Sequence, residues 1–218
     1  MESSFFFYTL VVLKRCCLAC LQKNTYLMNK ELLQFLSQFK ELSESQVHEL
    51  AGLMTVEEFN KNTLLISADQ PCVQCFFVLK GCLRQYRMVD GIEKTIGLYT
   101  EQEAVNFYSS QPDQPVAGSY VVSLEDSVVL IGNPEKDQAL YAGFPVLADI
   151  TRQMIEMDLG KTQNSFAKFI TSSPEERYLN LLKDKPDLLQ RVPQHMIASY
   201  LGMAPESLSR IRKRIFVK

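Results

Sequence analysis

Short β-rich segments separated by turn residues fill the middle of the chain, from residue 56 to residue 132. Strands are expected at 56–60, 63–67, 75–79, 82–89, 94–99, 120–124 and 127–132, with a less regular stretch at 104–110. The dipeptide Asp90-Gly91 between two of these strands is a strong hairpin signal, because both residue types tolerate positive φ angles. Short strands spaced about ten residues apart predict an antiparallel barrel or sandwich.

Helical patterns flank the β-rich region on both sides. The spacing of apolar residues predicts helices at 29–39, 43–54, 134–141 and 145–169. Ser43 is the N-cap of the second helix, and Gln46 completes its capping box. The last of the four would span about 36 Å at 1.5 Å per residue. A helix of this length either crosses a whole domain or pairs with its copy in a dimer, although its methionines also suit ordinary core packing.

Residues 1–27 differ in texture from the rest of the chain. The basic pair Lys14-Arg15 follows the apolar run Phe5–Leu13, whereas a secretory signal places its positive charge first. The run is also far shorter than the roughly 20 residues that cross a membrane. We therefore expect translation to begin at Met28, with a short membrane-surface anchor as the alternative.

Six cysteines are present: Cys16, Cys17, Cys20, Cys72, Cys75 and Cys82. Cys72 and Cys75 form a lone C-x-x-C, and a zinc or iron–sulfur site would need further ligands at suitable spacing. The three N-terminal cysteines could supply them only if residues 1–27 are translated and fold nearby. We expect free cysteines packed in a strand-rich domain, with no metal site and no cofactor.

Basic side chains are concentrated at the C-terminal end. Residues 1–171 carry 14 basic and 20 acidic side chains, whereas residues 172–218 carry nine basic and five acidic ones. A basic end on an acidic body suggests a segment that binds a polyanion. On charge alone, an ordinary fluctuation along the chain explains the asymmetry equally well.

The segment 192–215 has the pattern of two helices joined by a tight turn. Gly202 can supply the turn, and Pro205 can take the first position of the second helix. The inward-facing positions are Ile197, Ala198 and Leu201 in the first helix and Leu208, Ile211 and Ile215 in the second. A helix-turn-helix needs a small residue, a turn residue and an apolar residue at such places, and Ala198, Gly202 and Leu208 supply them.

The outer faces of the second helix suit DNA. Its candidate DNA-binding residues are Pro205, Glu206, Ser207, Ser209, Arg210, Arg212, Lys213 and Arg214. Glu206 can accept from the cytosine amino group, and Arg210 can donate to guanine O6 and N7. The serines can make short contacts, and the remaining three basic side chains can neutralise phosphates. A basic, solvated terminal helix in an unrelated bundle is the alternative.

The segment IASYLGMAPESLSRIRKRI resembles the helix-turn-helix of the cyclic-AMP receptor protein / fumarate–nitrate regulator (Crp/Fnr) family of bacterial transcription factors. Upstream, FFVLKGCLRQYRMVDGIEKTIGLY resembles the hairpins of that family's cyclic-nucleotide-binding β-roll. The resemblance implies an α+β fold. Its parts are an N-terminal β-roll (a double-stranded jelly roll) at 28–142, a dimerisation helix at 143–170 and a helix-turn-helix domain at 171–218. Many relatives add a β-hairpin wing after the recognition helix, so we expect a truncated wing and DNA binding that depends on the dimer.

The nucleotide-binding cassette departs from the family pattern. Relatives that bind cyclic nucleotides carry a Gly-Glu pair for the ribose and, about ten residues later, an Arg-Ser or Arg-Thr for the phosphate. Here the two places read AVNFY (104–108) and PVAGSY (115–120). Burial of a phosphate without a cation is costly, so cyclic nucleotides are not expected to bind unless Arg84 or Arg87 supplies the charge. The candidate effector-pocket residues are Arg84, Asn106, Phe107, Ala117, Gly118 and Ser119.

Together these features predict a cytoplasmic, homodimeric regulator that binds double-stranded DNA and senses a small molecule or another signal at the roll. A β-roll that binds a ligand or protein without specific DNA binding is the alternative. No membrane partner is expected. An enzyme is not expected either, because no nucleophile motif appears and neither His48 nor His195 lies in the β-rich region.

Overall fold

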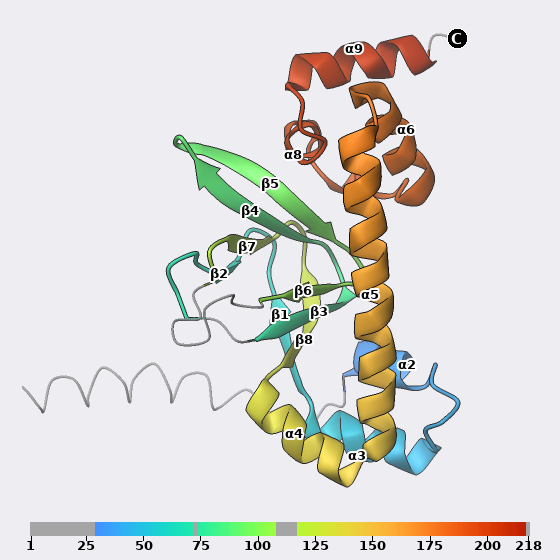
Figure 1. The fold of residues 1–218 in the computed structure, drawn as a ribbon. Helices are drawn as coiled ribbons and strands as arrows, with labels where there is room; N and C mark the ends of the chain where they lie inside the picture. Colours follow the sequence, from blue (N-terminus) through green and yellow to red (C-terminus); the bar gives the residue numbers. More distant parts are fainter. Residues whose placement is uncertain (1–28, 72–73, 108–116, 217–218) are drawn as a thin grey trace, which may run out of the picture.

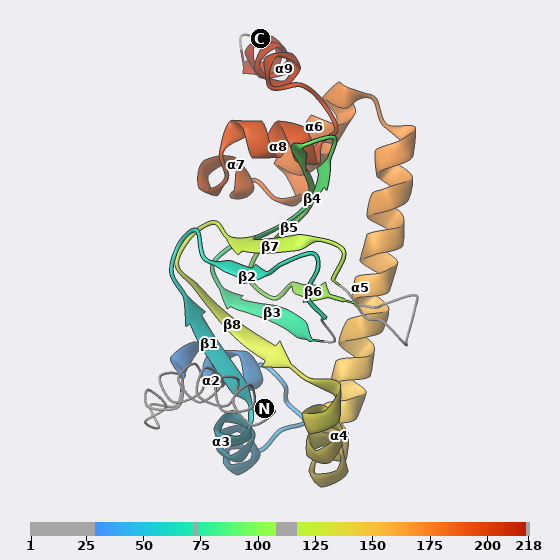
Figure 2. The same cartoon turned by 90° about the vertical axis from the view of Figure 1, so that its left-hand side faces the viewer.

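The computed structural model describes residues 29–71, 74–107 and 117–216 of the chain (Figure 1). Eight strands form two four-stranded antiparallel sheets, ordered β1-β8-β3-β6 and β2-β7-β4-β5. The strands are β1 (Thr55–Phe59), β2 (Leu64–Ile66), β3 (Cys75–Lys80), β4 (Leu83–Val89), β5 (Ile92–Tyr99), β6 (Ala104–Asn106), β7 (Tyr120–Ser123) and β8 (Ser127–Gly132). The two sheets face each other (Figure 2), which confirms the predicted antiparallel sandwich. We call this unit the roll.

The roll has its own apolar interior. The buried side chains that fill it are Ile66, Phe76, Val78, Leu83, Val105, Val121 and Val129. They come from strands of both sheets. Since side chains alternate between the two faces of a strand, the neighbours of these residues point away from the interior. The same alternation determines which polar side chains of the strands reach the interior.

The hairpin between β4 and β5 is tighter than predicted. Val89 pairs directly with Ile92, so Asp90 and Gly91 alone form the loop. Their φ angles of 53° and 74° are both positive, as a two-residue type I′ turn requires. The second strand therefore begins at Ile92, two residues earlier than the expected 94. The hairpin extends from the body of the roll to the level of α6 and α8 (Figure 2).

Two short helices precede the roll, α2 (Lys30–Leu36) and α3 (Glu44–Leu53). The predicted capping box of α3 is confirmed, because Ser43 accepts from the backbone of Gln46 and the Gln46 side chain accepts from the backbone of Ser43. Helix α2 ends before the expected residue 39. The Ser37 hydroxyl donates to the Leu33 carbonyl there, and the backbone continues as turns.

Helices α4 (Pro134–Gly143) and α5 (Pro145–Thr171) follow the roll. Helix α5 has 27 residues, slightly more than predicted, and runs alongside both sheets (Figure 1). Only its first half packs closely, with Leu147 and Ile150 buried, whereas residues 161–170 are all exposed. Among the described residues, no helix combines the length and hydropathy that a membrane-spanning segment needs.

Four helices complete the chain: α6 (Pro174–Asp184), α7 (Leu188–Arg191), α8 (Gln194–Tyr200) and α9 (Pro205–Phe216). Ser173 caps α6, and Glu176 completes a capping box there, with Pro174 in the first position. Helix α7 is short. Proline residues at 186 and 193 bound it and keep it to a single turn.

Candidate nucleic-acid interface and effector pocket

The turn between α8 and α9 has the tight geometry that its sequence predicts. Gly202 has φ +69°, and the Met203 N–H donates to the Ala198 carbonyl at 3.0 Å. This closes α8 with a left-handed glycine, as is common at helix C-termini. A Cβ at Gly202 would lie 3.1 Å from the Phe169 ring and 3.2 Å from the Arg177 guanidinium. The turn therefore lies against the end of α5 and the start of α6.

The predicted inward positions of α8 and α9 are the buried ones. Ile197, Ala198, Leu201, Leu208 and Ile211 are all at most 7% exposed, and Ile215 packs against the same cluster. The opposite side of α9 is consequently turned outward. The orientation of α9 is fixed because the apolar residues of α8 and α9 pack together on both sides of the turn.

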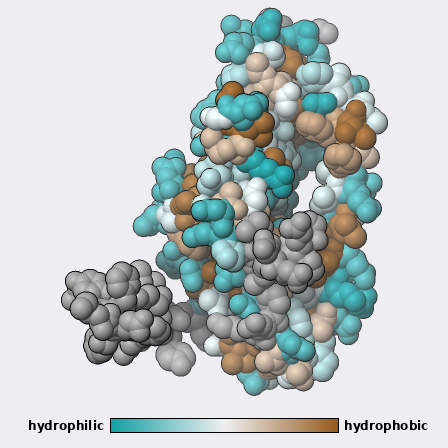
Figure 3. All heavy atoms as spheres, turned by 60° about the vertical axis from the view of Figure 1, so that its left-hand side comes forward, coloured by the Kyte–Doolittle hydropathy of each residue, from teal (hydrophilic) through white to brown (hydrophobic). Residues whose placement is uncertain are grey.

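Glu206, Arg210 and Lys213 form one exposed stripe on α9, because they are spaced by four and three residues. Glu206 lies in the first turn of the helix, where the dipole favours a negative charge. Pro205 and Arg214 are also exposed, whereas Ser207, Ser209 and Arg212 are partly buried. Figure 3 shows hydrophilic side chains gathered over this end of the molecule.

Two of the predicted phosphate-binding arginines have partners within the helical region. Arg212 donates to the Gln194 side chain at 3.1 Å, and Arg214 forms an ion pair with Glu175 of α6. Arg210 makes only a long contact of 3.4 Å to the Ser207 hydroxyl. Arg210 and Lys213 are therefore the more available cations on α9.

Ion pairs that sequence reasoning did not predict hold the C-terminal helices against the roll. Arg191 of α7 donates to the Glu101 carboxylate at 2.8 and 2.9 Å and also to Glu125. The Lys185 ammonium lies 2.6 Å from the Glu103 carboxylate. Hydrogen bonds to Glu101 and Glu125 raise the pKa of Arg191. Partial burial favours a higher pKa for Glu101, but hydrogen bonds from Arg191 and the backbone outweigh it and hold that pKa at about 2.

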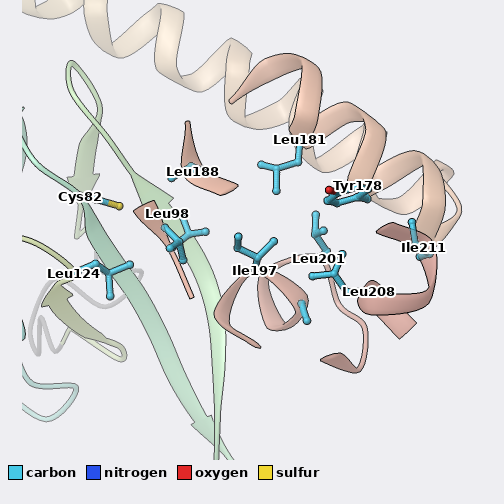
Figure 4. Packing of buried hydrophobic residues seen from close by; sticks show 12 residues of the cluster. Cys82, Leu98, Leu124, Tyr178, Leu181, Leu188, Ile197, Leu201, Leu208 and Ile211 are labelled. Atoms are coloured by element: carbon cyan, nitrogen blue, oxygen red, sulfur yellow. The ribbon is translucent and has the colours of Figure 1, made fainter. Parts of the chain in front are cut away.

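An uncharged hydrogen bond and apolar packing extend the same contact. The Thr95 N–H of β5 donates to the Ser199 hydroxyl of α8 at 2.9 Å. Figure 4 shows Leu98 of β5 beside Ile197 of α8, within a cluster that also contains Cys82 and Leu124 of the roll. We call these ion pairs, hydrogen bond and apolar contacts the docking contact. The only sequence signal for it was the basic excess of residues 172–218.

The polar groups inside the roll bind one another. Ser119 is 1% exposed, and its hydroxyl accepts from the Gln85 amide at 2.8 Å. The Tyr99 hydroxyl in turn donates to the Gln85 carbonyl oxygen at 2.8 Å. Burial raises the pKa of Tyr99 to about 12, so it remains a donor at neutral pH. Ala117 and Phe107 pack against the same interior.

Arg84 does not join the other predicted pocket residues. In the β4–β7 ladder Arg84 lies opposite Val122, which packs on the C-terminal helices. Its neighbour Gln85 lies opposite Val121, which belongs to the interior of the roll. The Arg84 guanidinium donates to Thr95 at 2.9 Å and forms an ion pair of 2.5 Å with Glu93. It therefore lies on the outer face of β4, because alternate residues of a strand point to opposite faces.

Arg87, the other proposed cation, is exposed and lies near Gly118. A Cβ at Gly118 would lie 4.0 Å from its guanidinium. Asn106 lies on the outer face of β6, since its neighbour Val105 fills the interior. Phe107, Ala117 and Ser119 thus meet in the roll interior, without Arg84 or Asn106.

The described cysteines, Cys75 and Cys82, are not in disulfides. Burial raises the pKa of the Cys82 thiol to about 12, so it is an unreactive part of the apolar cluster. Cys16, Cys17, Cys20 and Cys72 lie outside the described residues. In the part of the chain that the structure describes, no group of three or more His, Cys, Asp or Glu side chains is placed to hold a metal ion.

Comparisons with known proteins agree with this architecture. Residues 56–142 match the family model of the cyclic nucleotide-binding domain, and no curated protein matches the chain. A CooA mutant from Carboxydothermus hydrogenoformans is similar in structure, with a TM-score of 0.60 and 14% identity over 86% of this chain and 85% of that one. FixK2 from Bradyrhizobium japonicum is also similar in structure, with a TM-score of 0.61 and 16% identity over 75% of this chain and 85% of that one.

The c-di-GMP responsive global regulator CLP of Xanthomonas campestris gives a TM-score of 0.59 and 16% identity over 80% of this chain and 92% of that one. At these identities the likeness is one of fold. Together with the domain match, it confirms the resemblance inferred from the sequence. Residues 56–142 thus match the cyclic nucleotide-binding domain family, and the fold of the chain is that of the three proteins named above.

Proposed function

We propose that the protein is a cytoplasmic, homodimeric transcription regulator in which α8 and α9 form a DNA-binding helix-turn-helix. The observation that carries the proposal is the exposed stripe of Glu206, Arg210 and Lys213 on α9. A helix fits the major groove, where the first residues of a recognition helix reach base edges. In this arrangement Glu206 and Arg210 read bases, and Lys213 binds the backbone.

Helix α5 supplies the dimer contact in this proposal. Ile155, Leu159, Phe166 and Ile170 follow one stripe along it and are 46%, 57%, 66% and 61% exposed. Exposed apolar side chains in such a row are typical of a helix that pairs with another. Two copies paired along α5 would present two α9 helices to half-sites about one helical turn apart.

The signalling step follows from how α9 is held. Arg177 of α6 donates to the carbonyls of Phe169 and Leu201, and so joins the end of α5 to the turn before α9. A signal that changes the angle between paired α5 helices would therefore change the spacing of the two α9 helices. The effector is a ligand other than a cyclic nucleotide, since the interior of the roll presents no cation among the described residues.

The test is DNA selection followed by affinity measurement. Duplexes enriched from a random library by the full chain are labelled, and binding is followed by fluorescence anisotropy. Arg210→Ala is expected to cost about 1–3 kcal/mol and to relax the preference at one base position. Lys183→Ala, an exposed cation on α6, is the matched control and should bind like the wild type. Failure of the library to enrich, or equal effects of both variants, would remove the base-reading role.

A second candidate is a ligand- or protein-binding roll without specific DNA binding. It is favoured by one observation: Lys185 and Arg191 use their charges within the chain, so the basic C-terminal end is not wholly available to DNA. The two candidates differ in salt dependence, because DNA binding weakens steeply as salt rises.

A further inference from the structure

A cavity of about 660 Å³ lies between the roll and the helices α2, α3, α4 and α5. Its wall is mostly apolar and includes Phe35, Phe77, Leu130, Ile150 and Met154. Phe35 and Phe77 are in ring contact there, with centroids 4.7 Å apart. Cavities of about 300–1,000 Å³ with such linings are typical of sites for drug-sized molecules.

This cavity is distinct from the interior of the roll. Cys75 and Phe77 of β3 line it, whereas Phe76 between them fills the interior. In the same way Ala104 and Asn106 of β6 line the cavity, and Val105 points inward. The cavity therefore lies on the outer face of the sheet, and this placement explains why Asn106 is remote from Ser119.

One acidic group of the cavity wall makes no hydrogen bond and no close ion pair among the described residues. No hydrogen bond or ion pair joins Asp158 of α5 to another side chain of that part of the chain, although it is partly buried. Burial raises the pKa of Asp158 and the nearby charge of Glu103 adds to the effect, while the charges of Lys161 and Lys185 only partly oppose it. Such a carboxylate is suited to accept a hydrogen bond from a ligand.

The charges of the wall select against anions. Its charged side chains within the described residues are Asp137, Asp158 and Lys161, and Lys161 is exposed. A buried anion would meet the Asp158 carboxylate without a buried cation in the described part of the wall, which is costly. An apolar molecule with an N–H or O–H group would instead cover the aromatic wall and donate to Asp158.

We propose that this cavity is a ligand site for a largely apolar small molecule that carries a hydrogen-bond donor and no negative charge. As an effector site it rests on the proposed function, since α5 forms one wall and also carries the dimer stripe. A ligand there would contact the roll and α5 together, and so could shift the angle of α5. Binding itself is measured without DNA.

Two matched fluorescent probes test the proposal on the full chain. N-phenyl-1-naphthylamine is apolar with one N–H, and 8-anilinonaphthalene-1-sulfonate adds only a sulfonate to the same skeleton. The neutral probe should bind saturably, one per chain, and about tenfold more tightly than the sulfonate. In Asp158→Asn the ratio of the affinities of the two probes should fall to about threefold or less, because the carboxylate that repels the sulfonate is gone. Equal affinities of the two probes for the wild type would overturn the proposal.

Filling the cavity locates the bound probe. Thr151→Trp on α5 and Ala104→Trp on β6 enlarge side chains on opposite walls, and each should lower probe affinity at least about tenfold. Gln153→Trp places the same side chain on α5 outside the cavity wall and should leave affinity unchanged. Circular dichroism and thermal unfolding confirm that each variant is folded.

Two further outcomes would rule out a ligand site in this cavity. Unchanged probe binding in both filled variants would place the probe elsewhere on the chain and overturn the proposal. So would a wild type that binds no probe while the monomeric variant Leu159→Lys does, because the second copy would then occupy the cavity. Neither result bears on DNA binding, which is measured separately.

Discussion

Arg191 and Glu101 join segments 90 residues apart through two hydrogen bonds of 2.8 and 2.9 Å. The same guanidinium also pairs with Glu125, so one side chain of α7 holds two loops of the roll. Bidentate arginine–carboxylate pairs fix geometry as well as adding energy. The position of α8 and α9 is thereby tied to the roll independently of α5.

Loss of this arginine should weaken the whole chain. Arg191→Met is expected to lower the free energy of unfolding by about 1–2 kcal/mol, because two partly buried carboxylates lose their partner. Urea unfolding measures the change. Arg152→Met is the control, since Arg152 also pairs with two carboxylates, Asp149 and Glu156, but on the exposed surface of α5. An equal loss in both variants would show that the docking contact adds nothing specific.

Acid should release the docking contact. The pKa of Glu101 is about 2 in the folded chain, below its ordinary value of about 4.3. Its pairing therefore stabilises the fold fully above the ordinary value, and this stabilisation is lost as pH falls from about 4.5 toward 2. The melting temperatures of the wild type and of Glu101→Gln, measured by thermal unfolding, should therefore converge over this pH interval. Melting temperatures that stay equally far apart down to pH 2.5 would contradict the stabilising role of the Glu101 carboxylate.

Arg177 should matter beyond its charge. It donates to the carbonyls of Phe169, Ser172 and Leu201 and stacks 3.9 Å above the Phe169 ring. Arg177→Met leaves these acceptors without a donor and should cost about 2 kcal/mol in unfolding experiments. Arg177→Lys should recover less than half of that, because an ammonium lacks the planar fork. Full recovery by lysine would mean that charge alone is required.

The dimer stripe of α5 is testable without DNA. Leu159→Lys and Phe166→Lys place a charge in the row of exposed apolar side chains and should convert the dimer to a monomer. Sedimentation equilibrium measures the mass. Gln153→Lys lies on α5 outside that row and should stay dimeric. A wild type that is monomeric at micromolar concentration would contradict the pairing.

Features set by neighbouring residues were predictable from the sequence. The capping boxes at Ser43 and Ser173, the turn at Gly202 and the hairpin at Asp90-Gly91 each depend on residues at most three positions apart. The inward face of α9 followed from helical spacing, and the structure buries the predicted residues.

Features set by distant pairs were not predictable. The basic excess of residues 172–218 did not indicate which carboxylates of the roll pair with Lys185 and Arg191. The face of β4 on which Arg84 lies depends on strand register, and a shift of one residue reverses it. The cavity beside α5 arises only when the sheet and four helices are brought together.

The salt dependence of DNA binding shows whether α9 contacts the phosphate backbone. Affinity of the full chain for a selected duplex is measured from about 50 to 200 mM salt, for the wild type and for Lys213→Ala. Log K should fall linearly with log salt, and the magnitude of the slope should be smaller by about two in the variant, because each protomer of the dimer loses one phosphate contact. Affinity that does not change with salt, or an identical slope in the variant, would contradict the DNA-binding role of α9.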